Sequence, residues 1–166
     1  MNVNWELVRT IAILPGTALV YVPGLILWAT AGRVQVSGPG DWTFWAAILP
    51  AGLGLVLAVW TVRLFASVGG GTPAPWQPPQ KLVVRGPYRH VRNPMISGAL
   101  FLLAAEALFF RSWPLGGWMV LFLAANAVYF PLSEEKGLER RFGDDYRLYK
   151  AHVPRWVPRL RPWDLP

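Results

Sequence analysis

The 166-residue chain is 54% apolar and only 15% charged, with a formal net charge of +7. A soluble domain of this length usually carries about a quarter charged residues, so the composition favours a polytopic membrane protein built as one domain over residues 1–166. The absence of cysteine excludes disulfides, thiolate metal sites and a cysteine nucleophile. With only two histidines, no metal site is expected.

The first predicted membrane helix covers residues 8–31, since ~20 residues at 1.5 Å each cross the hydrocarbon core. Pro15 and Pro23 interrupt it, so neighbouring helices would have to satisfy the freed carbonyls. A cleaved signal peptide is the alternative, because Ala29-Thr30-Ala31 resembles a cleavage site, but the apolar region is too long for one. The second predicted helix covers residues 44–66.

A loop is predicted at 67–93. It contains Gly69-Gly70-Gly71 and five prolines, and so many breakers forbid a helix through it. The glycines could cradle a phosphate, but no helix follows them directly, so we interpret them as a hinge. Long loops are more often functional or disordered than idle, and Trp76, Val83 and Tyr88 indicate an ordered, partly buried segment.

Two shorter apolar helices are predicted at 94–110 and 115–130, and the few residues between them make an antiparallel hairpin. A tail follows at 131–166. In it, Ser133 resembles a helix cap with Glu134 and Glu135 in the first turn, and prolines exclude a regular helix beyond Val153. The predicted fold class is therefore all-α, a polytopic membrane protein with four transmembrane helices and a C-terminal helix and tail.

Lysine and arginine predict the orientation. They gather in the 67–93 loop and in the tail, whereas the opposite side would carry only Arg33 and Arg111. The positive-inside rule places both basic segments, and both termini, in the cytoplasm. Because these segments flank apolar helices and lack a recognised binding fold, nucleic acid is not expected as a partner. The compact size fits a bacterial inner membrane.

The loop and the acidic pair would meet at the same membrane face. Arg85, Arg89 and Arg92 could bind planar anions, the two glutamates could accept hydrogen bonds, and the aromatic faces of Tyr88 and Trp76 favour a cation. Together these groups could hold a zwitterionic ligand with a positive centre. The alternative is that the arginines meet lipid phosphates and pair with the glutamates.

Glu106 stands alone within the third predicted membrane helix. A charge inside the membrane is a functional candidate by default. Arg111 follows five residues later, and we favour a simple ion pair with it or contact with the interface.

The segment Gly86–Gly98, followed by Glu134-Glu135, Phe142-Gly143 and Val153-Pro154, resembles the isoprenylcysteine carboxyl methyltransferase family. That family is itself similar to the membrane phospholipid N-methyltransferases. The resemblance covers Ser67 to about Pro158. It implies S-adenosylmethionine as methyl donor, in a pocket closed by the hairpin, the loop and the acidic helix.

Carried over by this resemblance, the cofactor contacts are Lys81, Leu82, Val83, Val84, Tyr88, Asn93, Pro94, Met95, Ile96 and Glu135. Asn93 replaces a family histidine and cannot titrate near neutral pH, and Ile96 lacks a tyrosine hydroxyl. Phe130 and Pro131 stand where prenylcysteine enzymes place a substrate arginine, which weakens the case for a prenylated protein as acceptor. The predicted catalytic residues are Glu134, as base or orienting group, and Arg92.

The expected function is S-adenosylmethionine-dependent methyl transfer, by in-line displacement, to an amphiphilic or lipid-like acceptor at the cytoplasmic membrane face. Three alternatives remain open. They are an NADPH-dependent membrane reductase of the steroid-reductase type, a methyltransferase for a small thiol or carboxylate, and a non-enzymatic membrane scaffold.

Overall fold

The fold is known from a computed structural model that describes residues 5–70 and 79–165. The described residues are helical or irregular, without a β-strand among them, which confirms the all-α prediction. The elements are α1 (Trp5–Gly16), η1 (Thr17–Tyr21), α2 (Val22–Ala29), η2 (Ala31–Arg33), α3 (Trp42–Leu64), η3 (Phe65–Gly69), η4 (Gly86–Arg89), α4 (Pro94–Phe109), α5 (Trp113–Tyr129), η5 (Phe130–Glu134) and α6 (Glu135–His152).

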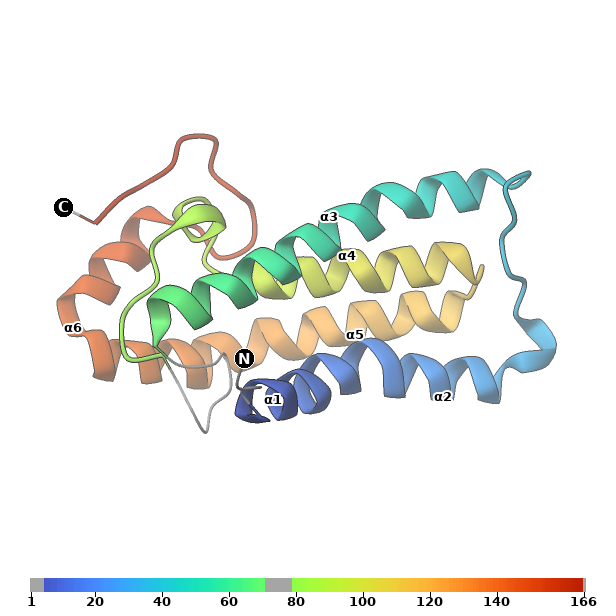
Figure 1. The fold of residues 1–166 in the computed structure, drawn as a ribbon, viewed down its shortest axis with the longest axis horizontal. Helices are drawn as coiled ribbons and strands as arrows, with labels where there is room; N and C mark the ends of the chain where they lie inside the picture. Colours follow the sequence, from blue (N-terminus) through green and yellow to red (C-terminus); the bar gives the residue numbers. More distant parts are fainter. Residues whose placement is uncertain (1–4, 71–78, 166) are drawn as a thin grey trace.

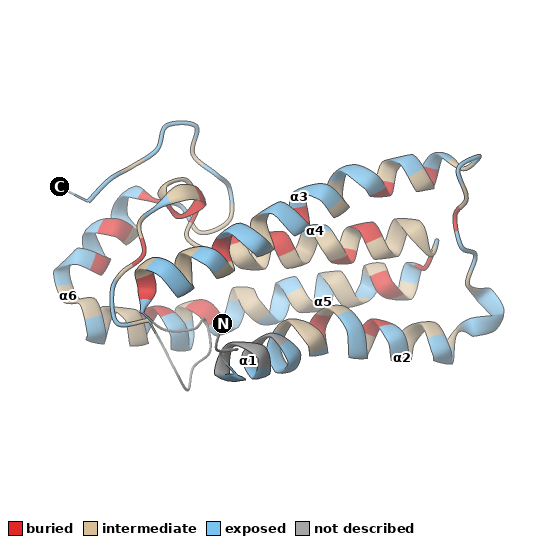
Figure 2. Cartoon of the chain, in the orientation of Figure 1, coloured by how far each residue is buried: buried red, intermediate tan, exposed pale blue. Residues whose placement is uncertain are grey.

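Within the described residues, three continuous helices are long and apolar enough to cross a membrane, namely Ala12–Ala29, Trp42–Gly69 and Trp113–His152. The fourth candidate, α4, is apolar but shorter. The prediction of four membrane helices is therefore confirmed only in part, for the three helices of sufficient length. Exposed residues run along the outside of the bundle (Figure 2). On α3 they include the apolar Leu49, Leu55 and Val56. Such an apolar exterior is what a lipid environment requires.

Wide π-helical turns accommodate two of the prolines. Proline has no N–H, so the helix loses a hydrogen bond there, and the wide turn η1 precedes Pro23. The carbonyl oxygen of Ala18, five residues before Pro23, instead accepts a hydrogen bond of 2.9 Å from the indole of Trp118 on α5. A neighbouring helix thus satisfies a freed carbonyl, as expected from the sequence.

Another wide turn, η5, contains Pro131 and joins α5 to α6 without a break. The predicted helix start at Ser133 is therefore wrong, because Ser133 lies inside η5 and the chain stays helical through it. Glu134 precedes α6 with helical φ and ψ and makes no side-chain capping bond. One helix thus carries the chain from the apolar α5 directly into the charged α6.

The long helices lie side by side and give the bundle two unlike ends (Figure 1). The α2–α3 connection and the α4–α5 turn meet at one end, where Arg111 pairs with Asp41 and donates to Thr43 at 3.1 Å. Of the two expectations for Glu106, the ion pair with Arg111 is wrong, because Arg111 pairs with Asp41. Contact of Glu106 with the interface stays a prediction. At the other end lie residues 79–93, α6 and the tail.

The packing of α3 on α4 depends on two glycines. A Cβ atom added at Gly54 would stand 2.7 Å from Cγ of Leu102 and 2.8 Å from the carbonyl oxygen of Gly98. At Gly98 the nearest atom would be Cβ of Leu57, at 3.1 Å. Small residues let membrane helices approach to backbone contact, so this crossing sets the spacing of α3 and α4.

We predict that Gly54→Ala destabilises the bundle by about 1–3 kcal/mol, because the added methyl group overpacks a contact with backbone on its far side. Gly52→Ala is the matched control on the same helix, where a Cβ meets nothing within 4 Å. It should be neutral or slightly stabilising, since alanine favours helix. Unfolding in mixed detergent measures both, and equal stabilities for the two variants would contradict the crossing described here.

Candidate active site

A cavity of about 300 Å³ lies at the α6 end of the bundle. We call it the site cavity, and its volume is at the lower end of the range for small-molecule pockets. Its walls come from the ends of α3, α4 and α5, from residues 79–93 and from α6. They are formed by Phe65, Pro79, Lys81, Leu82, Val83, Tyr88, Arg92, Asn93, Met95, Ile96, Tyr129, Phe130, Ser133, Glu134, Gly137, Leu138, Arg141, Phe142, Tyr146 and Tyr149.

Most of the residues singled out from the sequence meet at this cavity. The structure places Lys81, Leu82, Val83, Tyr88, Arg92, Asn93, Met95, Ile96 and Glu134 on its walls. Val84, Pro94 and Glu135 do not line it. The individual roles assigned to all these residues stay predictions. Trp76 and Gly71 lie outside the described residues.

Backbone hydrogen bonds hold the loop against the end of α3. Gly70 ends that helix with a left-handed φ of 63°, a conformation that glycine adopts without strain. The carbonyl oxygen of Gly69 then accepts bonds from the N–H groups of Gln80, at 2.8 Å, and Lys81, at 3.3 Å. The loop therefore returns to the helix that it left, which brings Lys81 to the cavity wall.

Tyr88 is fixed from several sides. Its side chain is buried and lies edge-on to Phe65, with ring centroids 5.7 Å apart. Its carbonyl oxygen accepts a bond of 2.8 Å from the hydroxyl of Tyr149 on α6. The turn before it begins at Gly86, where φ is 55° and an added Cβ would stand 2.9 Å from the indole nitrogen of Trp60. Glycine is thus required for this turn to reach α3.

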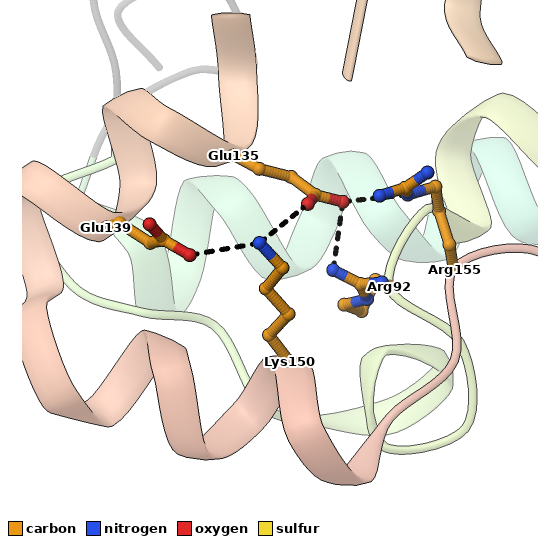
Figure 3. Close-up of polar contacts among 5 residues, drawn as sticks. All are labelled: Arg92, Glu135, Glu139, Lys150 and Arg155. Carbon is orange, nitrogen blue, oxygen red and sulfur yellow. Dashed lines mark hydrogen bonds and ion pairs between the residues drawn. The ribbon is translucent and has the colours of Figure 1, made fainter. Parts of the chain in front are cut away.

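Glu135 is the centre of an ion-pair cluster (Figure 3). Its side chain is 4% exposed, and Oε1 accepts hydrogen bonds from Arg92 Nη1, at 2.9 Å, and Arg155 Nε, at 2.8 Å. Lys150 Nζ forms an ion pair with Oε2 at 3.2 Å, and reaches Glu139 at 3.0 Å. We call these five residues the Glu135 cluster, and they join the loop, α6 and the tail.

The two adjacent glutamates have different environments. Burial alone would raise the pKa of Glu135, but the hydrogen bond from Arg155 and the charge of Arg92 outweigh it and hold that pKa below its usual value. Glu134 keeps accessible surface at the cavity wall and forms no ion pair with the described residues. Although Glu134 is an exposed residue, partial desolvation of its carboxyl at the cavity wall, together with the charge of Glu135, raises its pKa to about 7.

Two buried donors at the cavity lack a hydrogen-bond partner among the described residues. They are Nδ2 of Asn93 and Nε of Arg92. An unmade hydrogen bond on a buried polar group costs free energy, so both donors would gain from a polar ligand atom that reached them. With Glu134 and the aromatic walls, the cavity offers donors, a carboxylate acceptor and apolar faces within one space.

Several contacts at this end were not predicted. In the described part of the chain, Arg92 is the one loop arginine that pairs with a glutamate, whereas Arg89 pairs with Asp164 in the tail. Sequence reasoning also missed Lys150 and Arg155. They lie 15 and 20 residues after Glu135, and the chain between them is not one straight helix, so no spacing rule links these cations to the acid. The interpretation of Arg92 as a glutamate partner was the alternative left open, and it describes this arginine correctly.

We predict that Glu135→Ala lowers the free energy of unfolding by roughly 3 kcal/mol or more, because it leaves the nearly buried Arg92 without a counter-charge. The matched control is Glu139→Ala, whose carboxylate also pairs with Lys150 but is 32% exposed. Exposed pairs are usually worth less than about 1 kcal/mol. Unfolding titrations should separate the two variants, and a Glu135→Ala protein as stable as Glu139→Ala would refute the structural role of the cluster.

Comparison with known proteins gives one match. A family model described as phospholipid methyltransferase matches residues 42–145, from the first residue of α3 into α6. No curated protein and no solved structure shows a significant match. The matched part includes every residue that lines the site cavity except Tyr146 and Tyr149. Because the match covers more than half of the 166 residues, the chain belongs to the phospholipid methyltransferase family.

Proposed function

We propose that this membrane protein transfers a methyl group from S-adenosylmethionine to an amphiphilic or lipid-like acceptor at the cytoplasmic membrane face. The observation that carries the proposal is the site cavity, where unpartnered donors, one carboxylate and aromatic walls meet at the ends of apolar helices. The family assignment supports methyl transfer over reduction or a purely structural role.

The residues of the cavity fit the chemistry of S-adenosylmethionine. The free donors of Asn93 and Arg92 suit a carboxylate, and Glu134 suits an ammonium or ribose hydroxyl. Tyr88 and Phe142 offer faces for a ring or a positive centre. We propose that Lys81, Leu82, Val83, Met95 and Ile96 complete the walls around this ligand. When bound, S-adenosylmethionine supplies a methyl group activated on a sulfonium, ready for in-line displacement.

Glu135 has a different proposed role from the one that the family resemblance implies. Its carboxylate already binds Arg92, Arg155 and Lys150, and it does not line the cavity. We propose that it acts through Arg92, by holding the guanidinium at the cavity wall. This makes Glu135 a positioning residue. Glu134 is then the acid at the site whose charge no cation among the described residues neutralises.

Glu134 is the proposed base. An amine or thiol acceptor loses a proton when it is methylated, and a carboxylate whose pKa lies near the working pH can take that proton without being permanently protonated. With a pKa of about 7, Glu134 meets this condition. A carboxylate acceptor would need no base.

The shape of the cavity supports an amphiphilic acceptor. Tyr129, Phe130 and Met95 line it at the points where the apolar helices α5 and α4 meet the polar end of the bundle. An acceptor with an apolar tail could remain among these helices while its polar group faces Glu134. A small soluble thiol or carboxylate would gain nothing from this arrangement.

We predict that the purified protein binds S-adenosylmethionine and not NADPH in calorimetric titrations. Asn93→Leu should weaken binding about tenfold or more, since a hydrogen bond to a charged group contributes about 1.5–3 kcal/mol. Asn126→Leu is the matched control, because its amide bonds the carbonyl of Phe122 within α5 and does not line the cavity. Preference for NADPH would instead support a reductase, and no binding of either would leave only a scaffold.

We also predict that transfer of a labelled methyl group to the lipid fraction rises with pH, with a midpoint near the Glu134 pKa of about 7. The sign follows from the role, since the base works only when deprotonated. Glu134→Gln should slow transfer by roughly 10²–10⁴-fold and abolish this inflection. Label in the aqueous fraction would indicate a small acceptor. An unchanged inflection in Glu134→Gln would show that another group titrates.

A further inference from the structure

The tail contains an exposed apolar surface that the proposed methyl transfer does not use. Val157 is 76% exposed and Leu160 is 97% exposed, although neither belongs to a membrane helix. Arg159 and Arg161 flank Leu160, and Arg161 is exposed. We call residues 157–161 the tail loop. An apolar residue this exposed beside arginines is typical of segments that enter the membrane interface.

The tail loop is held in place by its backbone. The N–H of Arg159 donates to the carbonyl oxygen of His90 at 2.9 Å, and the ring of His90 contacts the carbonyl oxygen of Arg159 through Nδ1 at 2.8 Å. Before the loop, Val153 is 1% exposed, and the N–H of Arg92 donates to the carbonyl of Pro154 at 2.9 Å. The exposure of Val157 and Leu160 is therefore a fixed feature of a tethered segment.

The position of the loop indicates its partner. Trp156 lies edge-on against Phe130, with ring centroids 6.0 Å apart, and Phe130 directly follows the apolar helix α5. Val157 directly follows Trp156, and Trp156 packs at the point where the bundle leaves the membrane. Figure 1 shows the tail arching outward from this end of the bundle, to the side of the helices. Tryptophan itself prefers this depth.

We propose that the tail loop docks on the membrane surface at the α6 end of the bundle. Val157 and Leu160 enter the interfacial layer, and Arg161 meets anionic lipid headgroups. The charge complements such a surface, since lysine and arginine beside a membrane are attracted by anionic lipids. This contact is independent of the proposed methyl transfer, and it would persist without any methyl donor.

The cysteine-free chain allows a direct test. An environment-sensitive fluorophore is attached at position 160 in Leu160→Cys, and separately at 157 in Val157→Cys. Each protein is placed in nanodiscs of phosphatidylcholine with or without phosphatidylglycerol, at one copy and, separately, at two copies per disc. Both positions are exposed, so labelling should leave the fold intact. The control is Asp145→Cys, an exposed position just past the kink at Gly143 in α6. The helical turns before that kink can carry the chain up to ~20 Å beyond Phe130.

The expected result is that the labels at 160 and 157 emit at shorter wavelength than the label at 145. This difference should be larger with phosphatidylglycerol. Adding Arg161→Gln, or raising the salt concentration, should reduce the shift at 160. Equal spectra at 160 and 145 in both lipids would overturn the proposal. A shift that appears only in discs holding two copies would also overturn it, because the loop would then contact a second chain.

Discussion

The site depends on one buried carboxylate and the three cations that neutralise it. Glu135 stands where α6 leaves the apolar part of the bundle, and its side chain is 4% exposed. An isolated charge there would be prohibitively costly, so it requires partners. Those partners come from the loop, from α6 and from the tail, and they cannot all be present unless these three segments lie together. The Glu135 cluster therefore closes the end of the bundle.

Helical geometry explains why the neighbouring acid is left free. Successive residues in a helix point about 100° apart, since a turn takes 3.6 residues. When Glu135 faces the cations, Glu134 faces the cavity wall formed by the ends of α4 and α5. Glu135 is thus held in ion pairs, while Glu134 has a pKa suited to proton transfer. The wide turn at Pro131 matters here, because it carries the helix unbroken to both residues.

The sequence was sufficient to predict the all-α class, the apolar helices and the meeting of the loop with the acidic pair, because hydropathy and breaker residues report on these directly. It was not sufficient for Ser133, where capping chemistry predicts a helix start but the π-helical turn lets the helix continue. It also did not reveal the partner of Arg111, which is Asp41, 70 residues earlier in the chain. Contacts set by tertiary packing, such as that of Arg155 with Glu135, leave no local pattern.

The Glu135 cluster extends beyond the part of the chain that the family model matches. The matched residues, 42–145, include Glu135, Arg92 and nearly all of the cavity wall, whereas Lys150 and Arg155 lie beyond them. The shared part of the chain therefore contains the acid and one counter-charge, and the following segment contributes the other two. Without those two cations, Arg92 would be the one remaining counter-charge of Glu135 in the cluster, and the Glu135 side chain would be held by fewer contacts. The tail is thus part of the site's construction, and a tail tethered at the membrane surface would transmit that constraint to the cavity wall.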